Sequence, residues 1–399
     1  MSDKREIKRE IKRVLAIGQL PVEMGGNYTT GMGKVVYELS RQDYSGISYK
    51  TLALNAKDKK TLDPKYFGYT FSIGKLLKSL FLHPLKLYRE LQDYRVYLDY
   101  SPLRALFYRI NMDRVIDKLS PDCVHLHSID NVIPFFHTGK KEEVKSIITC
   151  HGIFGVEGNE HRKKLYIESL ARIDYATGLT EDIDRLLNSF HVPDKKRSVI
   201  PNGVDVDKFR YDEKARQTIR HEWNIPDDRT IFITVGSLQH RKGQLDFMSQ
   251  LKDCGIDYEY WIIGSGPDKD KIEKWVHNNG QEDRIRLIGY IPGEDLYRYY
   301  SAADVYAHTS YAEGQALSEI EAYTTGLKIL VNQDVVRTLA NSPENESRYR
   351  VISLEEGIIW DDKLIDWIKE RESGRTTDGS LNWQKIADMY TCIYKKLIQ

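Results

Sequence analysis

The sequence predicts an α/β protein made of two doubly wound, Rossmann-like domains, and three observations lead to this prediction. The chain has 399 residues, which is too long for a single ordinary hydrophobic core. An apolar strand at 14–18 runs into a glycine-rich loop and then into a helix from Lys34, as at the start of nucleotide-binding α/β units. After residue 230 the alternation of short apolar runs and helical segments begins again.

Composition narrows the classes of function. The chain has 59 lysines and arginines and 59 aspartates and glutamates, so its formal net charge is zero. No net electrostatic attraction would therefore draw it to nucleic acid or to a membrane. The four cysteines are scattered without metal-type spacing, which suits a reducing, cytoplasmic location. The apolar piece 14–17 is too short for a signal peptide or a membrane span. We therefore expect a soluble or at most peripheral protein with no nucleic-acid partner.

The segments of the first domain follow in order. Residues 3–13 are densely charged and predict a solvated surface helix. The next loop contains Gly25 and Gly26, but it lacks the spacing of a Walker A motif, so its glycines alone are weak evidence. Residues 72–118 predict helices rich in basic and aromatic side chains. Such helices are more often packed on a core than bound to a membrane.

Two apolar strands of the first domain are followed by histidine. Alternation over 122–128 puts His125 and His127 on the same side of one strand, with His127 nearer the carboxyl end, where open α/β sheets bind ligands. The next strand, 144–150, leads into His151. A lone histidine at such a position is usually structural, and no cysteine or carboxylate at ligand spacing supports a zinc site.

The run I-P-N-G-V-D marks the passage to the second domain. Pro201 beside Gly203 combines a rigid turn with a permissive residue, which favours a hinge. A D-x-D sequence at 205–207 follows this turn directly, so we interpret it as part of the turn and predict no metal site. The strands expected beyond it are 230–235, 260–263, 285–290, 304–308 and 327–331.

The most informative stretch lies between the last two of these strands. It reads E-G-x-x-L-x-x-x-E-A from Glu313, and helical spacing closed by Gly326 predicts a helix that begins near Gly314. The start of such a helix offers amide groups to a diphosphate. Glu321 lies about two turns further along, so two carboxylates could accept hydroxyl hydrogens in one cleft. Two glutamates at this spacing also occur on ordinary solvated helices.

The surroundings of this stretch resemble the retaining GT-B glycosyltransferases of the family 4 type, also described as glycosyl transferases group 1. The resemblance includes D-x-V-H-x-H, T-x-H-G and I-P-N-G-V-D, and it runs along most of the chain. It implies two Rossmann-like domains facing a central cleft. Residues 1–201 would bind the acceptor, 202–381 the nucleotide sugar, and a helix at 382–399 would cross back onto the first domain.

The resemblance also implies an activity. A metal-independent transferase (EC 2.4) would move a hexosyl group from a nucleotide diphosphate sugar to an acceptor hydroxyl, with retention and without a cofactor beyond the donor co-substrate. A UDP-sugar is the commonest donor of the family and GDP-mannose the second choice. The acceptor would be a glycan or a lipid-linked or protein-linked molecule of cell-surface polysaccharide or glycoconjugate synthesis. A peripheral position at the inner face of the membrane stays open.

Carried over residue by residue, the resemblance assigns the site. Glu313 and His127 would contact the donor sugar and Lys242 the diphosphate, and these three are the candidate catalytic residues. His151 would line the acceptor side, and no metal ligand is assigned. The donor-binding residues would be Gly25, Gly26, Arg241, Lys242, Gly314, Gln315, Ala316, Leu317 and Glu321.

Two departures keep another class of protein open. Ser237 stands where the family carries a second phosphate-binding arginine, and Arg241 is the alternative source of that charge. The glycine-rich segment expected beyond Val331 is also replaced. Both departures favour a non-catalytic partner or chaperone of another glycosyltransferase. A nucleotide-sugar hydrolase or epimerase on the same fold would need an acid/base pair near His127 that the sequence does not show.

Overall fold

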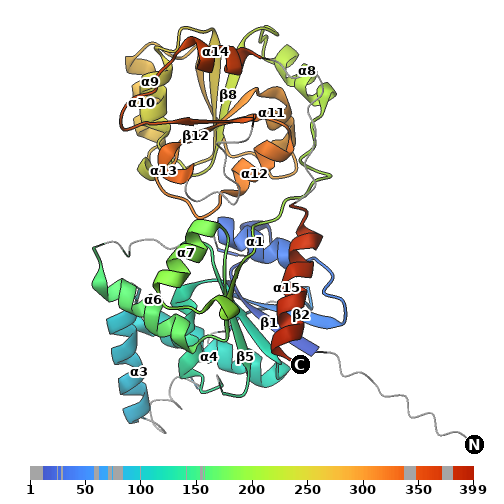
Figure 1. Cartoon of the computed structure of the whole chain (residues 1–399), viewed down its shortest axis with the longest axis vertical. Coiled ribbons are helices and arrows are strands. Elements are labelled where there is room, and N and C mark those ends of the chain that lie inside the picture. The colour runs from blue at the N-terminus through green and yellow to red at the C-terminus, as the bar shows by residue number, and fades with distance from the viewer. Residues whose placement is uncertain are drawn as a thin grey trace, which may run out of the picture. The chain divides into compact units, whose positions relative to one another are not determined.

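The computed structural model describes residues 12–24, 26–27, 30–57, 63–70, 74, 84–98, 100–140, 142–152, 156, 158–336, 347–370 and 381–399. Two compact units divide the chain (Figure 1). The first unit combines Met1–Pro201 with Trp383–Gln399, and the second unit is Asn202–Asn382. Each unit is built around one parallel sheet.

The first unit holds a seven-stranded sheet in the order β3-β2-β1-β4-β5-β6-β7, with every neighbouring pair parallel. The direction of winding reverses between β1 and β4, the switch point at which open α/β sheets bind ligands. The strands are β1 Lys12–Gly18, β2 Ile47–Lys57, β3 Tyr66–Tyr69, β4 Cys123–Leu126, β5 Lys145–Cys150, β6 Tyr175–Gly178 and β7 Arg197–Val199.

Helices cover this sheet because nearly every residue of its central strands β4 and β5 is buried, which requires cover on both faces. All four residues of β4 are buried, for example. Helix α15 comes from the far end of the chain and packs beside α1 (Figure 1). The helices are α1 Gly31–Ser40, α3 Pro84–Tyr97, α4 Pro102–Leu119, α5 Val132–His137, α6 Glu160–Arg172, α7 Glu181–Ser189 and α15 Trp383–Leu397, with 3-10 turns η1 Val22–Met24, η2 Ile129–Asn131 and η3 Asp194–Lys196.

In this unit one predicted helix is wrong where it can be described, one begins earlier than predicted, and the predicted helical region is found from residue 84 onward. The charged helix predicted at 3–13 falls mostly outside the described residues, and it is wrong at Lys12 and Arg13, which pair with β2 as the start of β1. Helix α1 begins at Gly31, earlier than predicted, because Thr30 Oγ1 accepts from Gly33 N at 2.9 Å and caps it. Within 72–118 the described residues from 84 onward form α3 and α4, as predicted.

The second unit holds a six-stranded parallel sheet in the order β10-β9-β8-β11-β12-β13, with its switch point between β8 and β11. The strands are β8 Thr230–Val235, β9 Tyr258–Ile263, β10 Ile285–Gly289, β11 Val305–His308, β12 Lys328–Asn332 and β13 Tyr349–Ile352. The helical elements are α8 Glu213–Glu222, η4 His240–Lys242, α9 Gln244–Leu251, α10 Lys269–Asn278, α11 Leu296–Ala302, α12 Leu317–Thr324, α13 Gln333–Val336 and α14 Asp362–Lys369.

The carboxylate of Asp304 ties the second unit together at the amino end of β11. Asp304 accepts from Nη2 of Arg216 at 2.8 Å, from Nη2 of Arg220 at 2.6 Å and from Ile231 N at 2.8 Å. Helix α8 is thereby joined to the start of β8, and the two guanidinium groups share one carboxylate and also donate to backbone carbonyls. The doubly wound α/β class predicted from the sequence is confirmed for both units.

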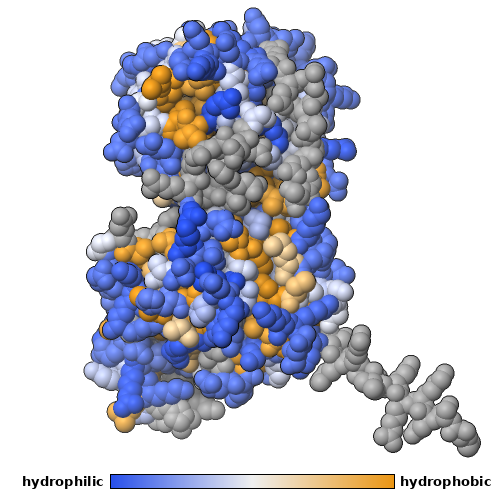
Figure 2. Space-filling model, in the orientation of Figure 1, coloured by the Kyte–Doolittle hydropathy of each residue, from blue (hydrophilic) through white to orange (hydrophobic). Residues whose placement is uncertain are grey.

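Most of the surface visible in Figure 2 is hydrophilic, with apolar patches among the charged residues. Over the stretches that the structure describes, every helix is either too short or too polar to cross a bilayer.

Candidate functional site

The second unit gathers charged side chains at the carboxyl ends of β8 and β11. Lys242 ends the 3-10 turn that follows β8, and Glu313 lies in the loop that follows β11. Oε1 of Glu313 contacts Nζ of Lys242 and lies 3.2 Å from NH1 of Arg241. Ser310 Oγ donates to the same oxygen at 3.0 Å. The structure therefore brings together Glu313, Lys242 and Arg241, which the sequence placed 71 and 72 residues apart.

Electrostatics keep Glu313 ionised. The side chains of Lys242 and Glu313 are only 15% and 12% exposed. Burial alone would raise the pKa of Glu313, but Lys242, His308 and Arg241 outweigh burial and lower that pKa below its ordinary value. Two cations beside one carboxylate leave a surplus of positive charge, so this cluster can attract an anion such as a phosphate.

Backbone contacts fix the cluster. Gly243 has φ +66°, and a Cβ there would lie 2.1 Å from the carbonyl oxygen of Thr309. Only glycine fits, and the turn after β8 therefore presses against the segment after β11. Thr309 Oγ1 donates to Lys242 O at 2.5 Å, and Tyr311 N donates to Arg241 O at 2.9 Å. These bonds hold Lys242 and Glu313 at a fixed separation.

Helix α12 begins at Leu317, and the predicted start near Gly314 is wrong. Asn202 explains the difference. Its backbone N donates to Gln315 Oε1 at 2.6 Å, and its Nδ2 donates to the main-chain oxygen of Gln315 at 3.1 Å. The carbonyl of Gln315 is thus engaged outside the helix, and Ala316 has an extended ψ of 120°.

The first turn of α12 has no side-chain cap among the described residues. Its amide groups at Leu317 and just beyond are therefore available to an anion, although the helix starts later than expected. At the other end, Gly326 has φ +86° and follows the last turn, as predicted for a left-handed cap.

Two further glutamates of α12 are buried. Glu321, 4% exposed, accepts from Tyr300 OH at 3.3 Å, and its assignment to the ribose stays a prediction. Glu319 Oε2 lies 2.5 Å from His308 Nδ1, although the two atoms are not aligned as a hydrogen bond. Nε2 of His308 has no hydrogen-bond partner in the described structure.

Sequence reasoning missed His308 and Glu319. The signal for His308 was its place as the last residue of β11, the same position relative to a strand that drew attention to the other histidines. Glu319 gave no separate signal, since a glutamate in the first turn of a helix is ordinary.

The first unit places its histidines at its own switch point. His127 follows β4 and His151 follows β5, and His127 Nδ1 lies 3.1 Å from His151 Nε2. The ring centroid of His125 is 4.1 Å from that of His127, so alternation correctly put both on one side of the strand. Burial lowers the pKa of His151 to about 4, and burial with the neighbouring histidines lowers the pKa of His127. These rings are neutral at pH 7.

The predicted glycine loop is described only in part. Gly25 lies outside the described residues. Gly26 forms a bridge with Ala56, and a Cβ at Gly26 would lie 2.0 Å from the carbonyl oxygen of Leu20. A side chain is therefore excluded at Gly26 by close packing of the backbone.

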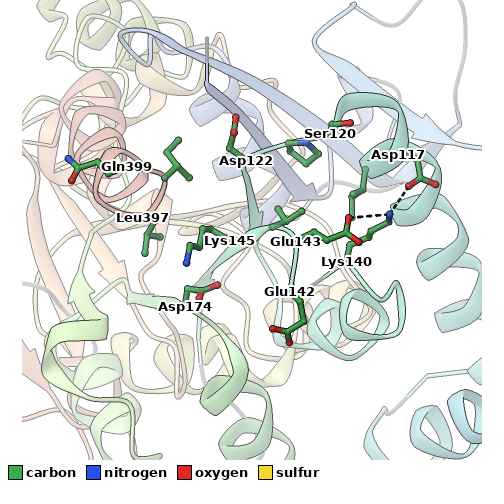
Figure 3. Close-up of a pocket in the computed structure, with 14 residues that line it drawn as sticks. Asp117, Ser120, Asp122, Lys140, Glu142, Glu143, Lys145, Asp174, Leu397 and Gln399 are labelled. Atoms are coloured by element: carbon green, nitrogen blue, oxygen red, sulfur yellow. Dashed lines mark hydrogen bonds and ion pairs between the residues drawn. The ribbon is translucent and has the colours of Figure 1, made fainter. Parts of the chain in front are cut away.

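A polar pocket of about 540 Å³ lies elsewhere in the first unit (Figure 3). It sits at the amino ends of β4 and β5, where Lys140 pairs with Asp117 and Glu143 at 3.4 Å each. All strands of this sheet are parallel, so the pocket lies at the amino ends of the strands, whereas His127 and His151 lie at the carboxyl ends. No group of three metal-ligating side chains is found in the part of the chain that the structure describes.

Comparison with known proteins gives two family matches. The model described as Glycosyltransferase Family 4 matches residues 56–208, and the model described as Glycosyl transferases group 1 matches residues 215–338. The alpha-monoglucosyldiacylglycerol synthase of Acholeplasma laidlawii is 24% identical over 254 residues, which cover 56% of this chain and 61% of that protein. The match thus spans less than two thirds of the relative's length.

Solved structures match over nearly the whole chain. Sucrose-phosphate synthase of Thermosynechococcus elongatus gives a TM-score of 0.69 at 17% identity, covering 97% of this chain and 99% of that chain. HepE of Anabaena in complex with UDP gives a TM-score of 0.66 at 13% identity, covering 96% and 95%. At these identities the likeness concerns the fold. With family models on both units, two doubly wound parallel sheets and this structural likeness, the chain belongs to the GT-B glycosyltransferases of the family 4 type.

Proposed function

We propose that the protein is a retaining glycosyltransferase that moves a hexosyl group from a nucleotide diphosphate sugar to an acceptor hydroxyl. The observation that carries this proposal is the convergence of Lys242 and Arg241 on Glu313 beside the uncapped start of α12. Cations and amide groups suit a diphosphate, and a carboxylate suits sugar hydroxyls. Family membership supports the same reading.

In the proposed reaction, the bond from the anomeric carbon to the diphosphate oxygen breaks and a bond to the acceptor oxygen forms. The hydroxyl proton of the acceptor passes to an oxygen of the leaving diphosphate. Lys242 and Arg241 would stabilise the charge that develops on the diphosphate, and the amides at the start of α12 would assist. Glu313 would hold the sugar in place rather than attack it.

Arg241 can supply the positive charge that is missing because Ser237 stands in place of the family's arginine. Its guanidinium lies on the same carboxylate oxygen as the ammonium of Lys242, and NH1 also donates to the carbonyl of Ala312 at 3.2 Å. Arg241 is therefore directed at the cluster and can supply a second cation to the leaving group. We assign Glu321 to the ribose, and the neutral ring of His127 to the outer edge of the sugar.

We further propose a UDP-sugar as donor and a cell-surface polysaccharide or glycoconjugate as product, with synthesis in the cytoplasm. HepE, which shares this fold, was solved with UDP, and the matched synthase of Acholeplasma laidlawii is named for a diacylglycerol product. No metal is required by this mechanism because the leaving group is stabilised by cations of the chain and by helix amides.

The first test is release of UDP or GDP from a panel of sugar nucleotides with EDTA present. Wild type should release one nucleotide slowly, and Glu313→Ala and Lys242→Ala should abolish that release. Lys252→Ala, an exposed lysine of the same unit, is the matched control and should behave as wild type. Release that survives both site variants would refute the assignment of the site.

The alternative is a non-catalytic partner of another glycosyltransferase, which Ser237 favours. Such a protein would release no nucleotide from any donor. Thermal stabilisation by UDP or GDP then separates a binding protein from one that has lost the nucleotide site altogether.

We also propose contact with a membrane surface through α3 and the start of α4. Leu85, Tyr88 and Leu103 are large apolar side chains that lie exposed there, next to Lys86 and Arg89. Apolar and basic side chains together suit an anionic bilayer surface. Binding to phosphatidylglycerol vesicles should be lost in Leu85→Glu, and wild type that ignores such vesicles would remove this proposal.

A further inference from the structure

The C-terminal helix carries two tyrosine hydroxyls into the polar cluster next to His127. Tyr394 OH lies 2.6 Å from Nδ1 of His125, and Tyr390 OH lies 2.9 Å from Oγ1 of Thr149. Nε2 of His125 is 2.8 Å from the same hydroxyl of Thr149. All four side chains are buried. Residues separated by 241 and 269 positions therefore meet in one hydrogen-bonded cluster inside the first unit.

The hydrogen atoms of this cluster can be assigned one by one. Thr177 Oγ1 donates to the carbonyl of Ile148, so at 2.8 Å it accepts the single hydroxyl hydrogen of Thr149. The two lone pairs of Thr149 then accept from Tyr390 OH and from Nε2 of His125. Burial lowers the pKa of His125 to about 3, so its ring carries one hydrogen, on Nε2. Nδ1 of His125 accordingly accepts from the hydroxyl of Tyr394.

The ring of His125, held by these hydrogen bonds, packs against the ring of His127. The two rings are in contact, tilted by 30° with their centroids 4.1 Å apart. On its other side His127 meets His151 through Nδ1. Its remaining nitrogen, Nε2, is buried and has no hydrogen-bond partner among the described residues. That nitrogen is the one polar atom of the ring left for a ligand.

We propose that Tyr394 and Tyr390 are positioning residues of the transfer reaction. Their hydroxyls set the tautomer and the place of His125, and the ring of His125 sets the place of His127. Neither phenol is expected to touch the substrate, because both side chains are buried and their hydroxyls are bonded to His125 and Thr149. This inference rests on the proposed contact between His127 and the donor sugar. Small displacements of a substrate-contacting group lower the rate of reaction far more than they alter the fold.

The hydrogen-bond assignment has its own test, which needs no activity. Two-bond ¹H–¹⁵N spectra of the labelled, full-length protein should show His125 as the neutral Nε2–H tautomer between pH 5 and pH 8. In Tyr394→Phe the Nδ1 resonance of His125 should shift because the hydroxyl that donates a hydrogen bond to it is lost. The resonances of His127 should shift as well. A wild-type His125 in the Nδ1–H form, or unmoved His127 signals in the variant, would overturn the inference.

The kinetic test separates positioning from folding. Tyr394→Phe and Tyr390→Phe should lower kcat about tenfold, while the donor KM changes less than about twofold. Tyr175→Phe is the matched control, since it removes a hydroxyl that donates to Arg197 O at 3.1 Å from β6, two strands away from β4. It should keep wild-type kcat.

Equal kcat in all three variants and wild type would contradict the positioning role. A wild-type protein that transfers no sugar would defeat the proposed function, and the positioning role with it. The spectra would then still show whether the tyrosines fix His125, so the two failures can be told apart.

Discussion

Glu313 and Lys242 are bonded to each other, although we assign one to the sugar and the other to the diphosphate. A diphosphate that binds Lys242 must therefore compete with the carboxylate of Glu313. Once the ammonium turns to phosphate, the carboxylate becomes available to a sugar hydroxyl. Under the proposed assignment, the pair would link recognition of the sugar to recognition of the diphosphate.

This competition predicts opposite effects of one substitution on binding and on transfer. Glu313→Gln removes the competing charge, so free UDP should bind about fivefold more tightly, if the ion pair that is lost contributes about 1 kcal/mol. The rate of sugar transfer should fall because a hydroxyl of the sugar loses the carboxylate that accepts its hydrogen bond. Calorimetry with UDP and turnover with the UDP-sugar measure the two effects. Weaker UDP binding in Glu313→Gln would show that the pair does not compete.

The lowered pKa of Glu313 predicts a pH-dependent contribution to stability. A carboxylate whose pKa is lower in the folded state than in the unfolded chain stabilises the fold above the unfolded pKa, and this stabilisation disappears as pH falls through the folded pKa. The free energy of unfolding of wild type should therefore exceed that of Glu313→Gln at pH 7, and the difference should shrink toward pH 4. Urea unfolding at both pH values measures it. Glu273→Gln, on an exposed face of α10, should show no such convergence.

Two glycines of the second unit allow a matched comparison. Gly243 and Gly255 have φ of +66° and +72°, so alanine at either position is strained by about 1–2 kcal/mol. Only at Gly243 would the new Cβ also strike the carbonyl of Thr309, at 2.1 Å. Gly243→Ala should therefore lose UDP affinity in addition to stability, whereas Gly255→Ala should lose stability alone. Equal UDP affinity in the two variants would separate the turn from the site.

Replacing Asn202 should loosen the segment before α12. Asn202→Ala removes the side-chain hydrogen bond to the carbonyl of Gln315 and should cost about 1–2 kcal/mol of unfolding free energy. The loop from Glu313 to Ala316 should then loosen, which raises the donor KM. Asn279→Ala, which loses an exposed hydrogen bond to Trp275 O, is the control and should leave KM unchanged.

Several strands of the second unit could be predicted from local sequence because they are short, mostly apolar and almost fully buried. The strand predicted at 230–235 is β8, and those predicted at 304–308 and 327–331 match β11 and β12 within one residue. Gly326 was predictable for the same reason, since a left-handed cap is a local requirement.

The errors have a common physical origin in contacts between distant residues. The start of α12 moved because Asn202, 113 residues away, engages Gln315. The sequence predicted a helix at 382–399, but it did not predict that the hydroxyl of Tyr394 bonds His125 across 269 residues. Helical spacing shows which side of α15 is buried, but it does not show which polar atom a buried tyrosine meets.

The completion of the first unit by α15 has a consequence for synthesis on the ribosome. The second unit, Asn202–Asn382, leaves the ribosome as one continuous segment. The first unit is complete only after Trp383–Gln399 has been synthesised. Until residues 390 and 394 leave the exit tunnel, Nδ1 of His125 lacks its donor and the face beside α1 lacks its covering helix. The second unit can therefore finish folding before the first, although it is translated later. A nascent chain that stops short of residue 390 would present an incomplete first unit to chaperones.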